Sequence, residues 1–242
     1  MTVLRILHLY PRELGINGDA GNVLALAERA RWRGVDVDIV SHAPGAELPA
    51  SADIVHIGSG PLSSQRAVAG DVARLAPRLR QWRDAGVPIL AIAGGWQLLG
   101  DEIVTPDGET LAGASVFPTR AVLGPRRHVA EVVVRMPDGV SLAGFENHSA
   151  TTTLSADATG AVPLGEVVSG FGNGDKTEGV VVGNAIGTHL HGPVLPMNPV
   201  LADRMLQTAL RGELPPVAQT ERVDRYAANA RRAIASRLGV AL

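Results

Sequence analysis

Residues 92–97 have the form of a nucleophile elbow, yet they contain no nucleophile. The segment, Ile-Ala-Gly-Gly-Trp-Gln, joins an apolar run to a short helical piece. In α/β hydrolytic enzymes such a strand-to-helix turn raises one residue to the carboxyl edge of the sheet, where small neighbours leave amide N–H groups free to face an oxyanion. The raised position here is Ala93, whose methyl group cannot attack a substrate. The alternative is an ordinary tight turn built on paired glycines.

Residues 187–193, Gly-Thr-His-Leu-His-Gly-Pro, form a second candidate site. An imidazole at the end of a strand suits a general base, because its unperturbed pKa is about 6.5. His189 and His191 lie two residues apart and would share one face of a strand, so a metal pair is conceivable. The spacing offers no third ligand, and we predict no metal site. A partly buried histidine with a structural role is the alternative.

Two glycine-containing turns complete the set. Gly58-Ser59-Gly60 follows an apolar strand, a place where backbone N–H groups often meet an anionic ligand or an oxyanion. Residues 18–22, Gly-Asp-Ala-Gly-Asn, precede the first expected helix, and an N-cap with its turn would explain them equally well.

Alternating apolar strands and amphipathic helices predict a parallel α/β sheet in the first half of the chain. The expected strands cover 4–10, 35–40, 54–57 and 88–92, and the expected helices cover about 23–34 and 63–84. Pro77 is expected to kink or divide the second helix. From about residue 116 short strands follow one another, which predicts antiparallel additions to the same sheet. These strands cover 116–122, 129–135, 141–146, 166–168, 179–182 and 185–190.

The C-terminal segment differs in composition from what precedes it. A helix resumes after Pro199, and Pro215-Pro216 ends it. The Ala- and Arg-rich segment 217–238 predicts a further helix, docked on the domain or on a partner. We therefore predict one domain over 1–211 and a C-terminal helical extension over 212–242.

Bulk composition excludes several classes of protein. The chain has 242 residues, 45% of them hydrophobic, and a mean hydropathy of +0.13, enough for a substantial core. A net charge of -2 lacks the basic excess of a nucleic-acid binder. The absence of cysteine excludes disulfides and thiolate metal sites. No run reaches the ~18 apolar residues of a membrane span, and the N-terminal run is too short for a signal peptide, so we expect a cytoplasmic protein.

Taken in order, the motifs resemble one family. They are Gly-Asp-x-Gly-Asn, Ile-Gly-Ser-Gly, Gly-Gly-Trp-Gln, Gly-Phe-Glu-Asn-His at 144–148, Phe-Gly-Asn-Gly at 171–174 and Gly-Thr-His-Leu-His-Gly-Pro. Over roughly residues 4–211 the chain resembles the GatD-type glutamine amidotransferase subunit of lipid II isoglutaminyl synthase, which is related to cobyric acid synthase amidotransferase domains. The resemblance implies a class I glutamine amidotransferase-like (flavodoxin-like) three-layer fold, with a mostly parallel central sheet and added antiparallel strands.

The resemblance also implies a reaction and a partner. A GatD-type subunit hydrolyses L-glutamine and passes ammonia to a Mur-ligase-like partner, MurT, in a heterodimer. That partner activates the α-carboxyl of D-glutamate in the peptidoglycan precursor lipid II with ATP and Mg, then amidates it. No cofactor is implied for the present chain.

Site residues carry over by position. The nucleophile would stand at Ala93, the general base would be His191, and the amides of Gly60 and Gly94 would form the oxyanion hole. The family pattern pairs Cys with His and has no third acid, and Pro193 at the acid's usual offset agrees. The substrate-binding residues would be Arg127, as the glutamine carboxylate contact, with Gln97, Glu146, Asn147 and His148 lining the pocket.

The departure at Ala93 decides the expected activity. Glutamine hydrolysis needs a thiolate that forms a γ-glutamyl thioester, and loss of a nucleophile costs on the order of 10⁶ in rate in a well-studied hydrolase. We therefore predict no useful glutaminase activity. An engineered cysteine-to-alanine variant is one explanation. A natural pseudoenzyme is favoured, because Trp96 also departs from the usual Tyr and cysteine is absent throughout. Alternative functions are a non-catalytic glutamine-binding or scaffolding subunit, or an amidotransferase for another acceptor such as a corrinoid.

Overall fold

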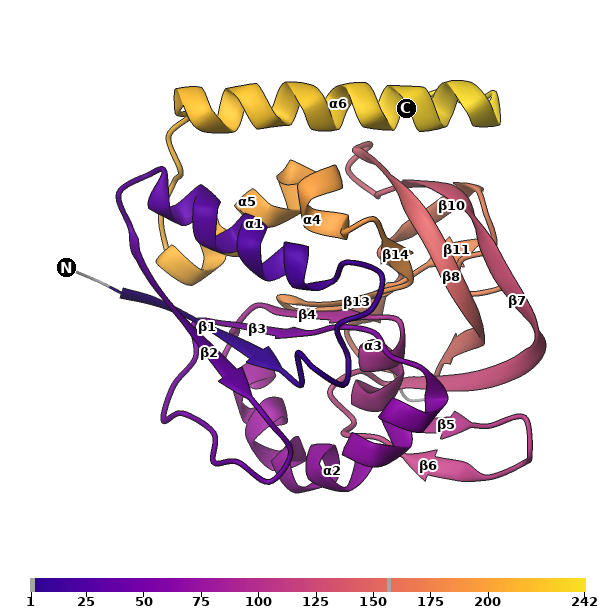
Figure 1. Cartoon of the computed structure of the whole chain (residues 1–242). Helices are drawn as coiled ribbons and strands as arrows, with labels where there is room; N and C mark the ends of the chain where they lie inside the picture. Colours follow the sequence, from indigo (N-terminus) through magenta and orange to yellow (C-terminus); the bar gives the residue numbers. More distant parts are fainter. Residues whose placement is uncertain (1–2, 156–157) are drawn as a thin grey trace.

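The computed structural model describes residues 3–155 and 158–242, and it has a central sheet between two layers of helices (Figure 1). Residues 1–2 and 156–157, which belong to the predicted unit 1–211, lie outside this description. Five neighbouring strands of the central sheet are parallel and two antiparallel strands extend it. In spatial order they are β2 (Asp36–His42), β1 (Val3–Leu9), β3 (Ile54–Ile57), β4 (Ile89–Ile92), β13 (Ala185–Thr188), β12 (Val180–Val182) and β9 (Ala161–Val162). The predicted α/β fold with a mostly parallel central sheet is confirmed.

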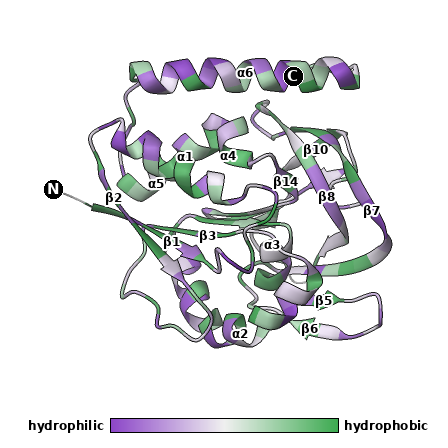
Figure 2. Cartoon of the chain, viewed as in Figure 1, coloured by the Kyte–Doolittle hydropathy of each residue, from purple (hydrophilic) through white to green (hydrophobic). Residues whose placement is uncertain are grey.

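Helices cover both faces of this sheet (Figure 1). One face carries α1 (Ala20–Arg31), α4 (Val194–Met197) and α5 (Pro199–Leu210), and the other carries α2 (Leu62–Asp84) and α3 (Gly94–Leu99). Every residue of β3 and β4 is buried, which agrees with their unbroken apolar sequences. Figure 2 shows the same arrangement, with hydrophobic residues gathered on the central strands and a mixed pattern along the outer helix.

Pro77 does not divide α2, which runs unbroken from Leu62 to Asp84. A proline inside a helix removes one backbone hydrogen bond. The side chains around it, Leu75, Ala76 and Leu79, are buried in the core. Packing of this face against the sheet therefore holds the helix together where local propensity alone predicts a break.

A second sheet was not predicted from the sequence. The expected strand 129–135 and residues 119–122 of the expected strand 116–122 belong to one strand, β7 (Thr119–Arg135), whereas residues 116–118 are not in a strand. This strand pairs with β8 (Ser141–Leu154) and breaks register between Leu123 and His128. The other members of this sheet are β5 (Glu102–Val104), β6 (Thr110–Ala112), β10 (Gly165–Ser169), β11 (Thr177–Glu178) and β14 (Leu190–His191). The expectation that these strands extend the first sheet is wrong, because strand patterns specify a buried face but no pairing partner. It is confirmed for the predicted strand 179–182, whose residues 180–182 form β12, an antiparallel strand of the first sheet.

The chain passes from the first sheet to the second at His189. The predicted strand 185–190 ends in the central sheet at Thr188, and Leu190 and His191 then pair with Glu146 and Phe145 of β8. This change of sheet places His191 in the second sheet, three residues beyond the point where β13 ends beside the carboxyl end of β4.

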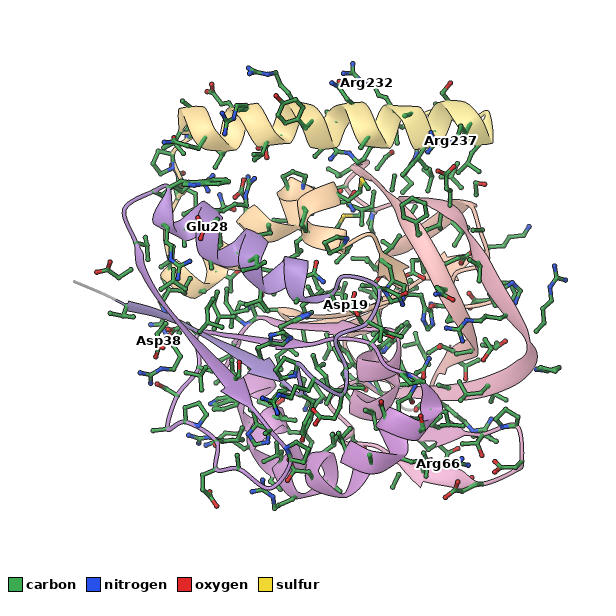
Figure 3. All side chains as sticks on the ribbon, in the orientation of Figure 1. Asp19, Glu28, Asp38, Arg66, Arg232 and Arg237 are labelled. Atoms are coloured by element: carbon green, nitrogen blue, oxygen red, sulfur yellow. The ribbon has the colours of Figure 1, made fainter. Side chains whose placement is uncertain are left out.

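The last helix, α6 (Ala218–Leu238), lies across α4 and the β7–β8 ribbon (Figure 1). Ile234 is buried in a small cluster with Val133 and Ala143 of that ribbon. Arg237 points from α6 toward the ribbon, where it pairs with Glu131, whereas Arg232 points away (Figure 3). Of the two sequence-based possibilities for this segment, the structure shows docking on the chain's own domain.

A buried arginine joins α6 to two other helices. Arg29 of α1 is 3% exposed, and its guanidinium donates to Asp203 of α5 at 2.5 and 2.9 Å and to Asp224 of α6 at 2.6 Å. Arg33 adds a bond to the Pro215 carbonyl at 3.0 Å. Since a buried guanidinium needs acceptors to offset its lost hydration, the two carboxylates hold the three helices in one arrangement.

We predict that Arg29→Ala lowers the free energy of unfolding by about 2–3 kcal/mol, because it removes the buried guanidinium between two facing carboxylates. Asp203 keeps only the ion pair with Arg33 at 3.3 Å, and Asp224 loses its cation. Arg31→Ala on the same helix is the control. It removes the exposed pair with Glu28 and an exposed 3.5 Å hydrogen bond to the Val37 carbonyl, and it should cost less than about 0.5 kcal/mol. Urea unfolding of both variants measures the difference, and equal midpoints would contradict the assignment of Arg29 as the link.

Candidate active site

The elbow is formed at the end of β4 and is strained. Ala93 has φ 41° and ψ -104°, a backbone conformation that a residue with a side chain rarely adopts. Its N–H donates to the Thr188 carbonyl at 2.8 Å, and its own carbonyl accepts from Gln97 N–H at 2.8 Å. The turn is therefore fixed both to the neighbouring strand β13 and to α3.

A small cavity of about 160 Å³ opens at this elbow. Six predicted site residues and the elbow alanine line it: Gly60, Ala93, Gly94, Gln97, Arg127, Asn147 and His148. A Cβ added at Gly94 would lie 3.0 Å from the Gly60 carbonyl oxygen and 3.2 Å from the Gly60 nitrogen, so the two loops are in close contact. Two backbone N–H groups from facing loops are a suitable arrangement for stabilising an oxyanion.

Arg127 enters the cavity from the irregular part of the β7–β8 ribbon. Its Nε donates to Asn147 Oδ1 at 2.6 Å and its Nη2 donates to the Asn147 carbonyl at 3.0 Å. These bonds set the direction of an otherwise exposed side chain. A guanidinium held in this way can bind a carboxylate through two parallel hydrogen bonds.

Glu146 lines a different hollow from most of the predicted pocket residues. Its carboxylate accepts from the Phe171 and Gly172 amides at 2.8 and 2.9 Å, and it lies 3.5 Å from His148 Nε2. Burial alone would raise the pKa of Glu146, but hydrogen bonds from His148 and from the two amides outweigh it and hold the pKa below its ordinary value. Glu146 therefore anchors the 171–172 turn from behind the cavity wall.

His191 lies in the neighbouring hollow of about 450 Å³, together with Glu146, and Asn147 lines both spaces. The imidazole is 2% exposed. Its Nδ1 lies 3.3 Å from Asp19 Oδ1, whereas its Nε2 is buried and has no hydrogen-bond partner. An unpaired buried ring nitrogen is available to a donor that enters the site.

Asp19 is the residue that the sequence-based assignment missed. Its position before α1 favours an N-cap, but its side chain makes no capping hydrogen bond. The fully buried carboxylate instead accepts from Ser59 N–H at 2.7 Å and faces His191, and Figure 3 places it between α1 and the strands. The signal in the sequence was the Gly-Asp-x-Gly-Asn motif itself, whose aspartate makes no capping hydrogen bond and contacts Ser59 and His191 instead.

His189 is part of the core of the second sheet. Its ring stacks on His148 with centroids 3.7 Å apart and lies 4.7 Å from Trp96, and Nε2 meets Thr152 Oγ1 at 3.1 Å. Burial, followed by the charges of His148 and His191, lowers the pKa of His189 well below its ordinary value. Across residues 3–155 and 158–242, no group of three or more His, Cys, Asp or Glu side chains is placed to hold a metal ion.

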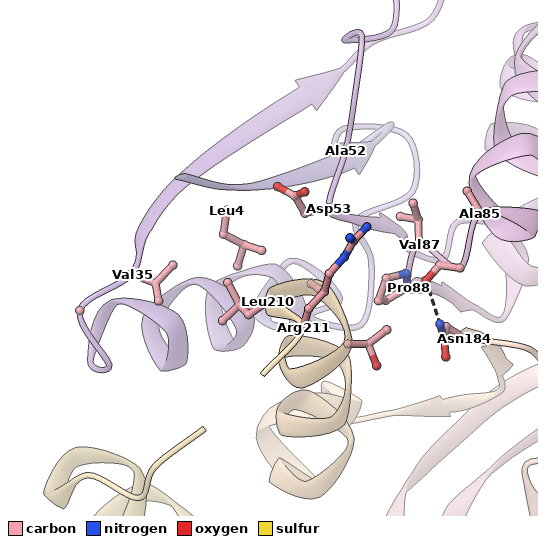
Figure 4. Close-up of a pocket in the computed structure, with 14 residues that line it drawn as sticks. Leu4, Val35, Ala52, Asp53, Ala85, Val87, Pro88, Asn184, Leu210 and Arg211 are labelled. Carbon is pink, nitrogen blue, oxygen red and sulfur yellow. Dashed lines mark hydrogen bonds between the residues drawn. The ribbon is translucent and has the colours of Figure 1, made fainter. Parts of the chain in front are cut away.

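A further hollow, of about 880 Å³, lies at the opposite edge of the central sheet (Figure 4). Asp53, Asn184 and Arg211 line it, and Asn184 donates to the Gly86 carbonyl at 2.8 Å. It contains none of the predicted site residues.

Within the described part of the chain, no helix is both long and apolar enough to cross a bilayer.

Comparison with known proteins agrees with the geometry. The profile of the CobB/CobQ-like glutamine amidotransferase domain matches residues 5–199. The chain is 32% identical over 213 residues to "Lipid II isoglutaminyl synthase (glutamine-hydrolyzing) subunit GatD" of Staphylococcus aureus (strain N315), with 86% of this chain and 85% of that protein covered. The subunit of the same name from Streptococcus pneumoniae (strain ATCC BAA-255 / R6) is 35% identical over 215 residues, covering 86% and 81%.

Solved structures support the fold alone. A structure described as "Crystal structure of glutamine amidotransferase" aligns with a TM-score of 0.57 at 16% identity, covering 84% of this chain and 98% of that chain. The glutaminase domain of Trypanosoma brucei CTPS aligns with a TM-score of 0.54 at 13% identity, covering 88% and 96%. The predicted class I glutamine amidotransferase-like fold is thereby confirmed.

We predict that Ala93→Gly costs about 1–3 kcal/mol less stability than Ala91→Gly. Both changes remove a buried methyl group and raise the conformational entropy of the unfolded chain by the same amount. The difference in unfolding free energy between the two variants therefore measures the positive-φ strain that is released at position 93. Denaturant unfolding of the two variants tests this. If Ala93→Gly is as damaging as its neighbour in β4, the elbow is not strained.

Proposed function

We propose, because the chain belongs to the family of CobB/CobQ-like glutamine amidotransferase domains, that it is a GatD-like subunit of a complex that amidates peptidoglycan precursors, and that it does not hydrolyse glutamine. Two relatives named as subunits of lipid II isoglutaminyl synthase support the first part, since the alignments span more than four fifths of each. Its partner would be a MurT-like Mur ligase in a heterodimer, and the ligase would bind the ATP and Mg²⁺ and amidate the α-carboxyl of D-glutamate in lipid II.

The methyl group of Ala93 at the raised elbow position supports the second part of the proposal. In a Cys-dependent glutaminase, the thiolate attacks the side-chain amide carbon, the oxyanion is held by backbone N–H groups, and the C–N bond then breaks to release ammonia. The remaining elements of that reaction have counterparts in this chain: Gly60 and Gly94 for the oxyanion, and His191 for the proton. Without the thiolate, no acyl-enzyme forms, so the ligase would draw ammonia or another amine from solution.

A non-catalytic glutamine-binding subunit is the second candidate function. The observation that favours it is the retained cavity, with Arg127 fixed toward it by two bonds to Asn147. Bound glutamine would then be a signal or a structural ligand and would not be consumed.

We predict that the parent protein releases no ammonia from glutamine above the uncatalysed background. Ala93→Cys should raise release at least about 10³-fold over that background, because it supplies the thiolate. The assay measures ammonia from each protein alone and with a co-expressed MurT-like ligase. Ala93→Ser is the matched control, since a hydroxyl at the same place is a far weaker nucleophile at neutral pH. Ammonia release by the parent at the rate of the cysteine variant would refute the assignment of position 93.

We predict that glutamine binds the parent protein and that Arg127→Ala weakens binding at least about tenfold, since a charged hydrogen bond to the ligand carboxylate is lost. Isothermal titration calorimetry measures the affinity. Arg126→Ala, an equal loss of charge on the adjacent exposed residue, should leave it within about twofold. Equal effects of the two variants would show that the carboxylate contact lies elsewhere, and no binding by the parent would leave scaffolding as its role.

A further inference from the structure

We infer that Asp19 is a positioning residue for His191: it fixes the imidazole in the tautomer that carries hydrogen on Nδ1 and so keeps Nε2 as a proton acceptor. The inference deepens the function proposed above, because it supplies a third group to a site that the family resemblance describes as a pair. The inference rests on the surroundings of the two ring nitrogens of His191 and on the hydrogen bonds of the buried Asp19 carboxylate.

The Asp19 carboxylate contacts His191 and Ser59 and makes no hydrogen bond to its own helix, α1. Asp19 is 0% exposed and makes no capping bond to α1, although that is the usual role of an aspartate before a helix. Its Oδ2 accepts from Ser59 N–H at 2.7 Å, and its Oδ1 lies 3.3 Å from His191 Nδ1. A buried carboxylate is costly unless both oxygens have partners, so the imidazole is one of the groups that make its burial tolerable.

The rest of the motif holds the histidine segment against Asp19. Asn22 Oδ1 accepts from Leu195 N–H at 2.9 Å. A side chain at Gly21 would begin 2.5 Å from Pro193, so only glycine lets α1 approach so closely. A side chain at Gly58 would likewise begin 3.0 Å from the Cβ of Asp19. The Gly-Asp-x-Gly-Asn motif therefore joins the oxyanion loop 58–60 and the histidine segment 191–195.

The chemistry of the two side chains decides the tautomer. A carboxylate can only accept hydrogen bonds, so the ring nitrogen facing it must carry the hydrogen. In a neutral imidazole the other nitrogen, Nε2, is then an acceptor, and it is the atom left buried without a partner. When Ala93→Cys supplies a thiol, its proton passes to Nε2, the imidazolium is stabilised by Asp19, and the same proton later leaves with ammonia.

Asp19→Asn should reverse the tautomer. The amide oxygen must still accept from Ser59 N–H, which turns the NH₂ group toward His191. An NH₂ group only donates, so Nδ1 becomes the acceptor and Nε2 takes the hydrogen. The shape of the site is kept while the proton acceptor is lost.

The test is a ¹⁵N NMR measurement on the parent protein alone, at mildly alkaline pH. His191→Gln identifies the signals among the seven histidines. We expect a pyrrole-type shift for Nδ1 and a pyridine-type shift for Nε2, and the opposite pattern in Asp19→Asn. The control is Asp53→Asn, because Asp53 also accepts a backbone N–H, from Arg5 at 2.7 Å, and lines the hollow at the opposite edge of the sheet. It should leave His191 unchanged.

Several results would overturn the inference: an Nε2–H tautomer in the parent, an unchanged tautomer in Asp19→Asn, or an equal change in Asp53→Asn. The parent measurement needs no variant of Asp19 and so stands even if Asp19→Asn fails to fold. In the Ala93→Cys background, Asp19→Asn should also lower kcat for glutamine by about 10²- to 10⁴-fold with KM changed less than about threefold. Because the NMR arm uses neither glutamine nor ligase, its outcome is independent of the proposed function.

Discussion

The parallel pairing of β4 with β13 determines how the whole site is assembled. Ile92 lies opposite Thr188, and the chain continues the pairing by one bond, from Ala93 N–H to the Thr188 carbonyl at 2.8 Å. Both strands end at the same edge of the sheet, so the elbow and the histidine segment leave it side by side. Strands separated by nearly a hundred residues in sequence can only be brought together in this way by the tertiary fold.

Buried carboxylates then hold the loops that surround this edge. Asp19 binds the 58–60 turn and His191, and Glu146 binds the 171–172 turn. Glu178 accepts from Thr188 Oγ1 and from His189 N–H, and burial raises its pKa above the ordinary value. Each acid satisfies backbone N–H groups that would otherwise be unpaired in the interior. The polar residues of the motifs thus support the geometry of the site as much as its chemistry.

The elbow keeps its positive-φ conformation although the residue at its tip, Ala93, has no nucleophilic side chain. Positive φ at Ala93 persists because the strand pairing behind it and α3 ahead of it leave the backbone no other path. The cavity, the facing glycines at 60 and 94 and the fixed guanidinium of Arg127 are likewise present. Strain and pocket shape therefore belong to the fold, whereas the proposed loss of amide cleavage rests on one side chain.

The sequence by itself determined the local features. Continuous apolar runs specify the buried parallel strands, glycine and proline mark the turns, and the absence of cysteine leaves no thiolate in the chain. Only the tertiary structure decided the rest: the second sheet, the docking of α6 through Arg29, the separation of Glu146 from the cavity at Ala93 and the pairing of Asp19 with His191. The physical reason is that periodicity and propensity act over a few residues, whereas strand partners and buried charge pairs are chosen by packing between distant segments.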